Sequence, residues 1–240
     1  MRTVDTVEKG DVITLNIDED SGGIEPNGSL EATAAFENEA VVIFDKPAKM
    51  PVHPSARHRT DTLGNLFAAR YPGLTFRPVN RLDKDTSGLC AVAKDPYAAA
   101  LMQGSCKKVY YAAVHGKLPE TGTISAPIAR ERESIITRCV RTDGQEAVTH
   151  YRKIAENSKY TLVEIELETG RTHQIRVHFS YLGNPLAGDD LYGGSREDIS
   201  RQALHCGRMT FTDPITKERK AVESPLPNDI KKLFAEEKNE

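Results

Sequence analysis

The chain has 240 residues, enough to bury a substantial core as one large domain or as one domain with a small appendage. Charged residues make up 28% of the sequence and hydrophobic residues 38%, which indicates a folded, soluble protein rather than a disordered one. The formal net charge of -3 is not typical of a nucleic-acid-binding protein. Any affinity for nucleic acid must therefore come from a local basic patch.

The sequence also indicates in which cellular compartment the protein is expected. No apolar run approaches the roughly 20 residues of a membrane span, and the N-terminus lacks the apolar core of a signal peptide. We therefore expect a cytoplasmic protein that does not enter a membrane. The four cysteines are widely spaced and form no Cys-x-x-Cys pair, which argues against a structural zinc site and a disulfide framework.

In chain order, the first 20 residues contain two apolar-alternating stretches, at 2–7 and 12–17, that predict a short strand pair. Residues 21–37 are rich in turn formers and acidic side chains, so they are expected to form a linker. The main domain is expected to span residues 38–240.

Within this domain, β-branched and aromatic runs predict strands at 40–44, 89–93, 107–116, 147–154, 160–167 and 203–211. The strands at 147–154 and 160–167 are expected to pair antiparallel. Helical spacing of apolar residues predicts helices at 62–70, 97–103, 172–182 and 228–235. The expected N-caps are Asp61 or Thr60 for the first helix, Asp95 for the second and Thr172 for the third.

Residues 79–88 combine two cations, two carboxylates, two hydroxyls and a glycine directly before the predicted strand at 89–93. A charged loop next to a buried strand is a common way to present reactive groups to a cleft. A solvated turn, in which Asp and Ser side chains bind local backbone donors, has the same composition. Composition alone leaves both interpretations open.

The stretch Arg81-Leu82-Asp83-x-x-Thr86-Ser87-Gly88 resembles the catalytic loop of the RluA-type pseudouridine synthases, which isomerise uridine in ribosomal and transfer RNA. Other stretches resemble further motifs of that family, namely Lys46-Pro47 with His53-Pro54, Lys108-x-Tyr110-x-Ala112, and Gly170 to His178. The resemblance covers roughly residues 38–230. The strand pair before it resembles a truncated remnant of the family's small N-terminal RNA-binding module.

This resemblance implies an α+β fold with a long, mixed and mostly antiparallel sheet, flanking helices and an RNA-binding cleft. It implies that Asp83 is the nucleophile, attacking either C1′ or the uracil ring, and that Arg176 pairs with Asp83. Tyr110 is expected to stack on the uracil, with proton transfer as a second role left open. Arg81 is expected to displace the target base. Further RNA contacts are expected from Lys46, His53, Lys108, Arg171, His173 and Gln174.

Pseudouridine formation involves no redox change, so the resemblance implies no cofactor and no metal. RNA is the expected partner, and a monomer is the expected state. Asn80 departs from the pattern, because the family often has His at this position. Since Asn cannot titrate near neutral pH, a loop-shaping or RNA-contacting role is expected there.

Other interpretations lead to different chemistry. The stretch Asp83-Lys84-Asp85-Thr86 also fits the motif of haloacid-dehalogenase-type phosphotransferases, whose aspartate is phosphorylated beside magnesium, but no buried apolar strand precedes it here. His173 and His178 are five residues apart and so point to different helix faces, unlike zinc-binding pairs. A non-catalytic RNA-binding protein would not need the reactive residues of the loop.

Overall fold

The computed structural model describes residues 8–10, 23–131 and 136–235. Within these residues, a ten-stranded sheet has the order β1-β2-β4-β11-β5-β10-β9-β6, with β3 paired to β4 and β12 to β11, and a second sheet contains β7 and β8. The strands are β1 Thr33–Glu37, β2 Val41–Lys46, β3 Arg77–Pro78, β4 Ser87–Ala93, β5 Lys107–His115, β6 Thr121–Ser125, β7 Ile128–Arg130, β8 Arg138–Val140, β9 Val148–Glu156, β10 Tyr160–Leu167, β11 Leu204–Thr212 and β12 Arg219–Glu223. The helices are α1 Leu63–Arg70, α2 Pro96–Ser105, α3 Gln174–Tyr181, the 3-10 helix η1 Asp190–Tyr192 and α4 Asn228–Lys232.

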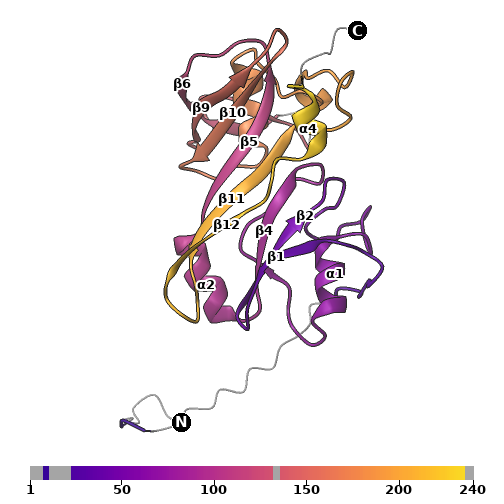
Figure 1. Cartoon of the computed structure of the whole chain (residues 1–240), viewed down its shortest axis with the longest axis vertical. Coiled ribbons are helices and arrows are strands. Elements are labelled where there is room, and N and C mark those ends of the chain that lie inside the picture. The colour runs from indigo at the N-terminus through magenta and orange to yellow at the C-terminus, as the bar shows by residue number, and fades with distance from the viewer. Residues whose placement is uncertain (1–7, 11–22, 132–135, 236–240) are drawn as a thin grey trace.

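The pairing directions confirm the expected mixed, mostly antiparallel sheet of an α+β fold. The pair formed by β9 and β10 is antiparallel, as predicted. Strands β4 and β11 form the parallel pair of the sheet, through His205 opposite Ser87 and Cys206 opposite Gly88. In Figure 1, β5 and β11 run along the molecule and connect β6, β9 and β10 at one end to β1, β2 and β4 at the other.

The starts of α1 and α2 follow from local side-chain chemistry. Helix α1 is capped by Thr62 rather than by Asp61 or Thr60, because Thr62 and Asn65 form a reciprocal capping box. Helix α2 has the predicted cap, since Asp95 accepts a hydrogen bond from the Ala98 backbone. None of the described helices is long and apolar enough to cross a bilayer.

The predicted Thr172 cap of α3 is wrong. His173 occupies the cap position in the left-handed region, with a φ of 57°, and no side-chain hydrogen bond caps the helix. This conformation is uncommon for a residue with a Cβ atom, and it turns the chain sharply just before α3. The segment Gly170–Thr172 is therefore loop rather than helix.

The boundary between the expected linker and the main domain also needs correction. Residues 33–37, inside the expected linker 21–37, form β1 and pair antiparallel with β2. Ile24 and Leu30 pack against the main core. The ordered domain therefore already includes these positions, and the predicted strands at 2–7 and 12–17 lie outside the described residues.

Gly88 allows the closest approach in the parallel pair. Its φ is +106°, and a Cβ atom there would lie 2.3 Å from the carbonyl oxygen of Cys206. Only glycine adopts such a φ without strain, and a backbone carbonyl cannot move aside like a flexible side chain. Gly88 therefore lets β4 lie against β11 directly after the Asp83 loop.

We predict that Gly88→Ala lowers the free energy of unfolding by about 3 kcal/mol, from backbone strain and overpacking combined. Urea denaturation measures this change. Gly104→Ala in α2 is the matched control, because its Cβ would meet no atom within 4 Å. That control should raise stability by about 0.5–1 kcal/mol, since alanine favours a helix. Equal stability of the Gly88→Ala and wild-type proteins would contradict this close packing of β4 against β11.

Candidate active site

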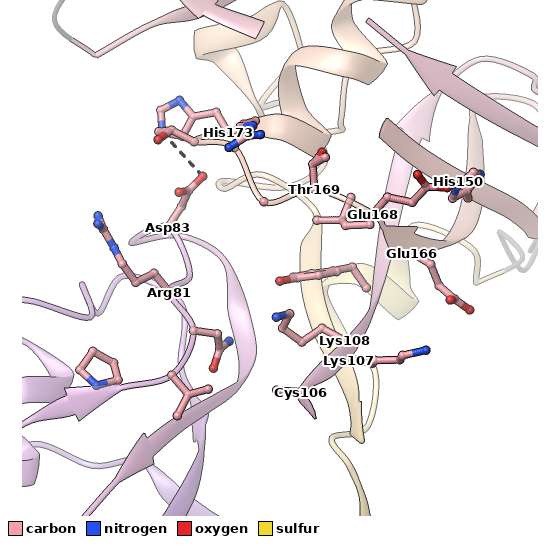
Figure 2. Close-up of a pocket in the computed structure, with 18 residues that line it drawn as sticks. Arg81, Asp83, Cys106, Lys107, Lys108, His150, Glu166, Glu168, Thr169 and His173 are labelled. Atoms are coloured by element: carbon pink, nitrogen blue, oxygen red, sulfur yellow. Dashed lines mark hydrogen bonds and ion pairs between the residues drawn. The ribbon is translucent and has the colours of Figure 1, made fainter. Parts of the chain in front are cut away.

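A cavity of about 970 Å³ opens between the loop before β4, the start of β5 and the segment after β10. A smaller cavity of about 80 Å³ adjoins it and is lined by Asp83, Tyr110 and Arg176. Figure 2 shows Asp83 and His173 facing one another, with Arg81 on the same loop as Asp83. The three residues expected to be catalytic thus come from distant parts of the chain and meet at one place.

Arg176 is held between two carboxylates. Its Nε and Nη2 donate to Asp189 at 2.7 and 2.8 Å, and its Nη1 donates to Oδ2 of Asp83 at 2.9 Å. The Asp189 side chain is 1% exposed, whereas that of Asp83 is 29% exposed. Burial alone would lower the pKa of Arg176, but the two carboxylates outweigh burial and raise it, so the guanidinium stays charged. Asp189 therefore fixes Arg176 from the buried side, and Asp83 remains accessible from the cavity.

Two buried cationic side chains, Lys46 and Arg201, donate hydrogen bonds to the backbone of the Asp83 loop. Lys46 Nζ donates to the carbonyl of Lys84 at 3.1 Å. Arg201 Nη1 donates to the carbonyl of Asp85 at 3.2 Å. Because these carbonyls immediately follow Asp83, the donors restrict where its carboxylate can lie.

The structure contradicts an RNA contact for Lys46, whose side chain is fully buried. Besides Lys84, its ammonium donates to the carbonyls of Pro47 and Met50 at 2.8 and 2.7 Å. Burial lowers its pKa to about 8. All three ammonium protons have backbone acceptors, so Lys46 shapes the loop and cannot reach a ligand.

Gln174 is likewise corrected from an RNA contact to an internal one. It is 2% exposed, and its Oε1 accepts hydrogen bonds from Thr169 Oγ1 and the Arg171 backbone. Its Nε2 donates to Val148 O and Thr149 Oγ1. The amide is therefore fully used in holding the turn before α3.

Tyr110 lies on β5, is 7% exposed and lines both cavities. Burial raises its pKa well above 10, with smaller contributions from nearby cysteines and Asp83. Its hydroxyl therefore keeps its proton at neutral pH.

The other expected RNA contacts are distributed around the opening. Arg81, Arg171 and His173 line both cavities, and Lys108 lines the larger one. His53 does not line either cavity; it is exposed, and its ring lies 5.3 Å from that of Phe76. Partial desolvation of the ring, with a smaller effect of Arg81, lowers the pKa of His53, so its ring is neutral at pH 7.

Asn80 was expected either to shape the loop or to contact RNA, and its hydrogen bonds show that it shapes the loop. Its Oδ1 accepts from the Ala91 backbone at 2.8 Å, and its Nδ2 donates to the Leu89 carbonyl at 3.1 Å. These bonds tie the loop to β4.

The described residues contain no cluster of three or more His, Cys, Asp or Glu side chains that could hold a metal ion.

Four supporting residues were not predicted from the sequence: Asp189, Tyr192, Arg201 and Gln202. Arg201 is 4% exposed and forms a two-bond ion pair with Asp229 in α4. Gln202 donates to Thr86 Oγ1 at 3.3 Å. The available signal was weak: these four residues lie within or beside the stretches 186–191 and 199–206, and their side-chain partners lie 13 to 116 positions away in the sequence.

We predict that Asp189→Asn lowers the free energy of unfolding by about 3 kcal/mol, because it leaves a buried guanidinium without its main counter-charge. Urea denaturation provides the measurement. Asp190→Asn is the matched control, since that neighbour forms an exposed pair with Arg196 and should change stability by less than about 0.5 kcal/mol. Similar losses in both variants would show that the Arg176 pair is not the dominant effect.

Sequence comparison gives consistent matches. A family model described as RNA pseudouridylate synthase matches residues 40–181. The uncharacterized RNA pseudouridine synthase YjbO of Bacillus subtilis is 44% identical over 83% of this chain and 74% of the relative. Ribosomal large subunit pseudouridine synthase D of Pseudomonas aeruginosa is 37% identical over 96% of this chain and 79% of the relative.

Solved structures agree with the sequence matches. Human RNA pseudouridylate synthase domain containing 1 superposes with a TM-score of 0.67 at 28% identity, covering 84% of this chain and 86% of the human one. Human RNA pseudouridylate synthase domain containing 4 shares the fold, with a TM-score of 0.65 at 22% identity and coverage of 82% and 89%. The chain belongs to the RluA-type family of RNA pseudouridine synthases, isomerases that act on RNA.

Proposed function

We propose that this pseudouridine synthase isomerises specific uridines in ribosomal or transfer RNA, with Asp83 as the nucleophile. The observation that carries the proposal is the Asp83 carboxylate, 2.9 Å from the Arg176 guanidinium in a cavity that Tyr110 also lines. The name of the Pseudomonas aeruginosa relative favours ribosomal RNA. Transfer RNA is the second proposed substrate class, to be tested beside ribosomal RNA.

The reaction breaks the N1–C1′ bond of a uridine and joins C5 to C1′, while C5 loses a proton and N1 gains one. A carboxylate can attack either C1′ or the uracil ring and form a covalent intermediate. Asp83 suits this role because it is partly exposed, whereas Asp189 is enclosed. Arg176 offsets the charge of the carboxylate and orients one of its oxygens.

In this proposal Tyr110 stacks on the uracil. Because its pKa lies well above 10, Tyr110 can donate a proton but does not serve as a base at neutral pH. A group other than the Tyr110 hydroxyl must therefore remove the C5 proton. The stacking role needs only the aromatic ring, and Tyr110 lines both cavities.

A uridine within folded RNA must leave its stack before Asp83 can reach it. Arg81 is exposed, lies two residues before Asp83 and lines both cavities, so we assign it the displacement of the base. Lys107, Lys108 and Arg171 surround the larger cavity, where they can neutralise backbone phosphates. Figure 2 shows Lys107 and Lys108 on the strand beside this cavity.

We predict that Asp83→Asn reduces pseudouridine formation by at least about 1000-fold while RNA affinity changes by less than about threefold, because only the nucleophile is lost. Ribosomal and transfer RNA transcripts would be incubated in parallel and analysed by nucleoside mass spectrometry. Asp190→Asn is the matched control and should retain activity. An active Asp83→Asn enzyme would refute the proposed nucleophile, and activity on neither RNA class would refute the proposed substrates.

We predict that Arg81→Ala slows modification of a folded hairpin about 10- to 100-fold more than that of a single-stranded oligonucleotide with the same target, because only the hairpin requires costly base extrusion. Single-turnover rates on both RNAs provide the measurement. Arg208→Ala is the control, since Arg208 pairs with Glu223 across β11 and β12 and lines neither cavity. Equal losses on the two RNAs would limit Arg81 to general RNA binding.

A further inference from the structure

His173 and Tyr192 form a hydrogen-bonded pair beside Asp83 that has no role in the reaction as proposed so far. The Tyr192 hydroxyl lies 2.8 Å from His173 Nδ1, and the two rings meet edge to face at 5.7 Å. The Tyr192 hydroxyl also accepts a hydrogen bond of 3.0 Å from the Arg138 backbone. These contacts determine where the histidine carries its proton.

The direction of each hydrogen bond follows from the groups involved. A backbone amide can only donate, so the Tyr192 oxygen is the acceptor for Arg138. The hydroxyl's own proton then needs an acceptor, and among the described residues His173 Nδ1 is the one within reach. Nδ1 is therefore unprotonated, and a neutral His173 carries its proton on Nε2.

The surroundings of His173 keep it neutral. Burial is the largest influence and lowers its pKa; Arg176 lowers it further, while Asp83 and Asp189 act in the opposite direction. The Nε2 atom is 3.7 Å from Asp83 Oδ2, which is beyond hydrogen-bonding distance. Figure 2 marks the ion-pair contact between His173 and Asp83 with a dashed line. The Nε2–H group therefore lies next to the carboxylate while remaining available to a ligand.

Tyr192 is itself firmly placed. Its ring lies 5.0 Å from the Arg176 guanidinium carbon, in cation–π contact. Its carbonyl accepts a 2.8 Å hydrogen bond from Ser180 in α3. One side chain thus supports both Arg176 and His173, and His173 is further constrained by its left-handed backbone.

We infer that Tyr192 is a positioning residue that holds His173 as the Nε2–H tautomer, and that His173 donates a hydrogen bond to an oxygen of the reacting nucleotide beside Asp83. This inference rests on the proposed function. The Nε2 atom of His173 lies 3.7 Å from Asp83 Oδ2, and in the proposed reaction that carboxylate attacks C1′ or the uracil ring. The acceptor is therefore a ribose oxygen or a uracil carbonyl.

The tautomer can be measured without any activity assay. Long-range proton–nitrogen NMR spectra of the wild-type enzyme at pH 7.5 distinguish Nε2–H, Nδ1–H and charged rings, and loss of a signal in His173→Gln assigns it. His178 is the Nε2–H reference because its Nε2 donates to Ala126 O, and His58 is the Nδ1–H reference because its Nδ1 donates to Asp61. An Nε2–H pattern is expected for His173. An Nδ1–H or charged pattern would overturn the inference.

Measurements of kcat and KM test whether the orientation of His173 by Tyr192 affects the reaction rate. Tyr192→Phe keeps the ring against Arg176 but removes the hydroxyl, so kcat should fall about tenfold while KM for RNA changes less than about twofold. His173→Leu should show a similar loss, whereas His173→Gln retains an amide donor and most of the activity. Tyr181→Phe, on the exposed end of α3, is the matched control with unchanged kcat.

The double variant separates this role from a purely structural one. In the His173→Gln background, Tyr192→Phe should have little further effect, because no imidazole remains to be oriented. Wild-type kcat in Tyr192→Phe, or the same tenfold loss in the His173→Gln background, would refute the inference. Absence of pseudouridine formation by the wild-type enzyme would instead refute the proposed function, and the NMR result would still decide the tautomer.

Discussion

A buried guanidinium shared by two carboxylates sets the geometry of the whole site. Asp189 accepts two hydrogen bonds from Arg176, and Asp83 accepts one. The segment that carries Asp189 is itself fixed to β5, because Ala187 donates to the carbonyl of Ala113. Strand β5 also carries Tyr110. The proposed nucleophile Asp83, the Arg176 guanidinium that pairs with it and the Tyr110 ring are therefore all positioned relative to this one strand. This arrangement gives the preorganisation that electrostatic catalysis requires.

The cations of the site divide into two groups by burial. Lys46 and Arg201 are enclosed and bind main-chain carbonyls of the Asp83 loop. Arg81 and Arg171 are exposed at the cavity, where an RNA backbone can reach them. Taking a charge out of water is costly unless its protons find acceptors, and the loop carbonyls supply these acceptors. The enclosed cations therefore specify loop shape, whereas the exposed ones are available for ligand binding.

The sequence predicted the main strands and helices because their periodicity is strong, and motif resemblance identified the residues that meet in the cavity. It did not distinguish enclosed from exposed polar residues, so Lys46 and Gln174 were both expected to contact RNA. The edge strand at 33–37 was missed because its side chains are only half-buried at alternate positions. The left-handed His173 makes a tertiary hydrogen bond to Tyr192, 19 positions away, which a local sequence pattern cannot reveal.

The parallel pairing of β4 with β11 has a consequence for how the enzyme matures. Ser87, at the start of β4, is hydrogen-bonded to His205, which lies 118 positions later in the chain. During translation the loop bearing Asp83 leaves the ribosome long before its neighbouring strand has been made. Contacts of such long sequence separation form late, so a partly synthesised chain exposes this loop without its supports. The Asp83 loop is therefore expected to reach its final conformation only after nearly the whole domain has emerged.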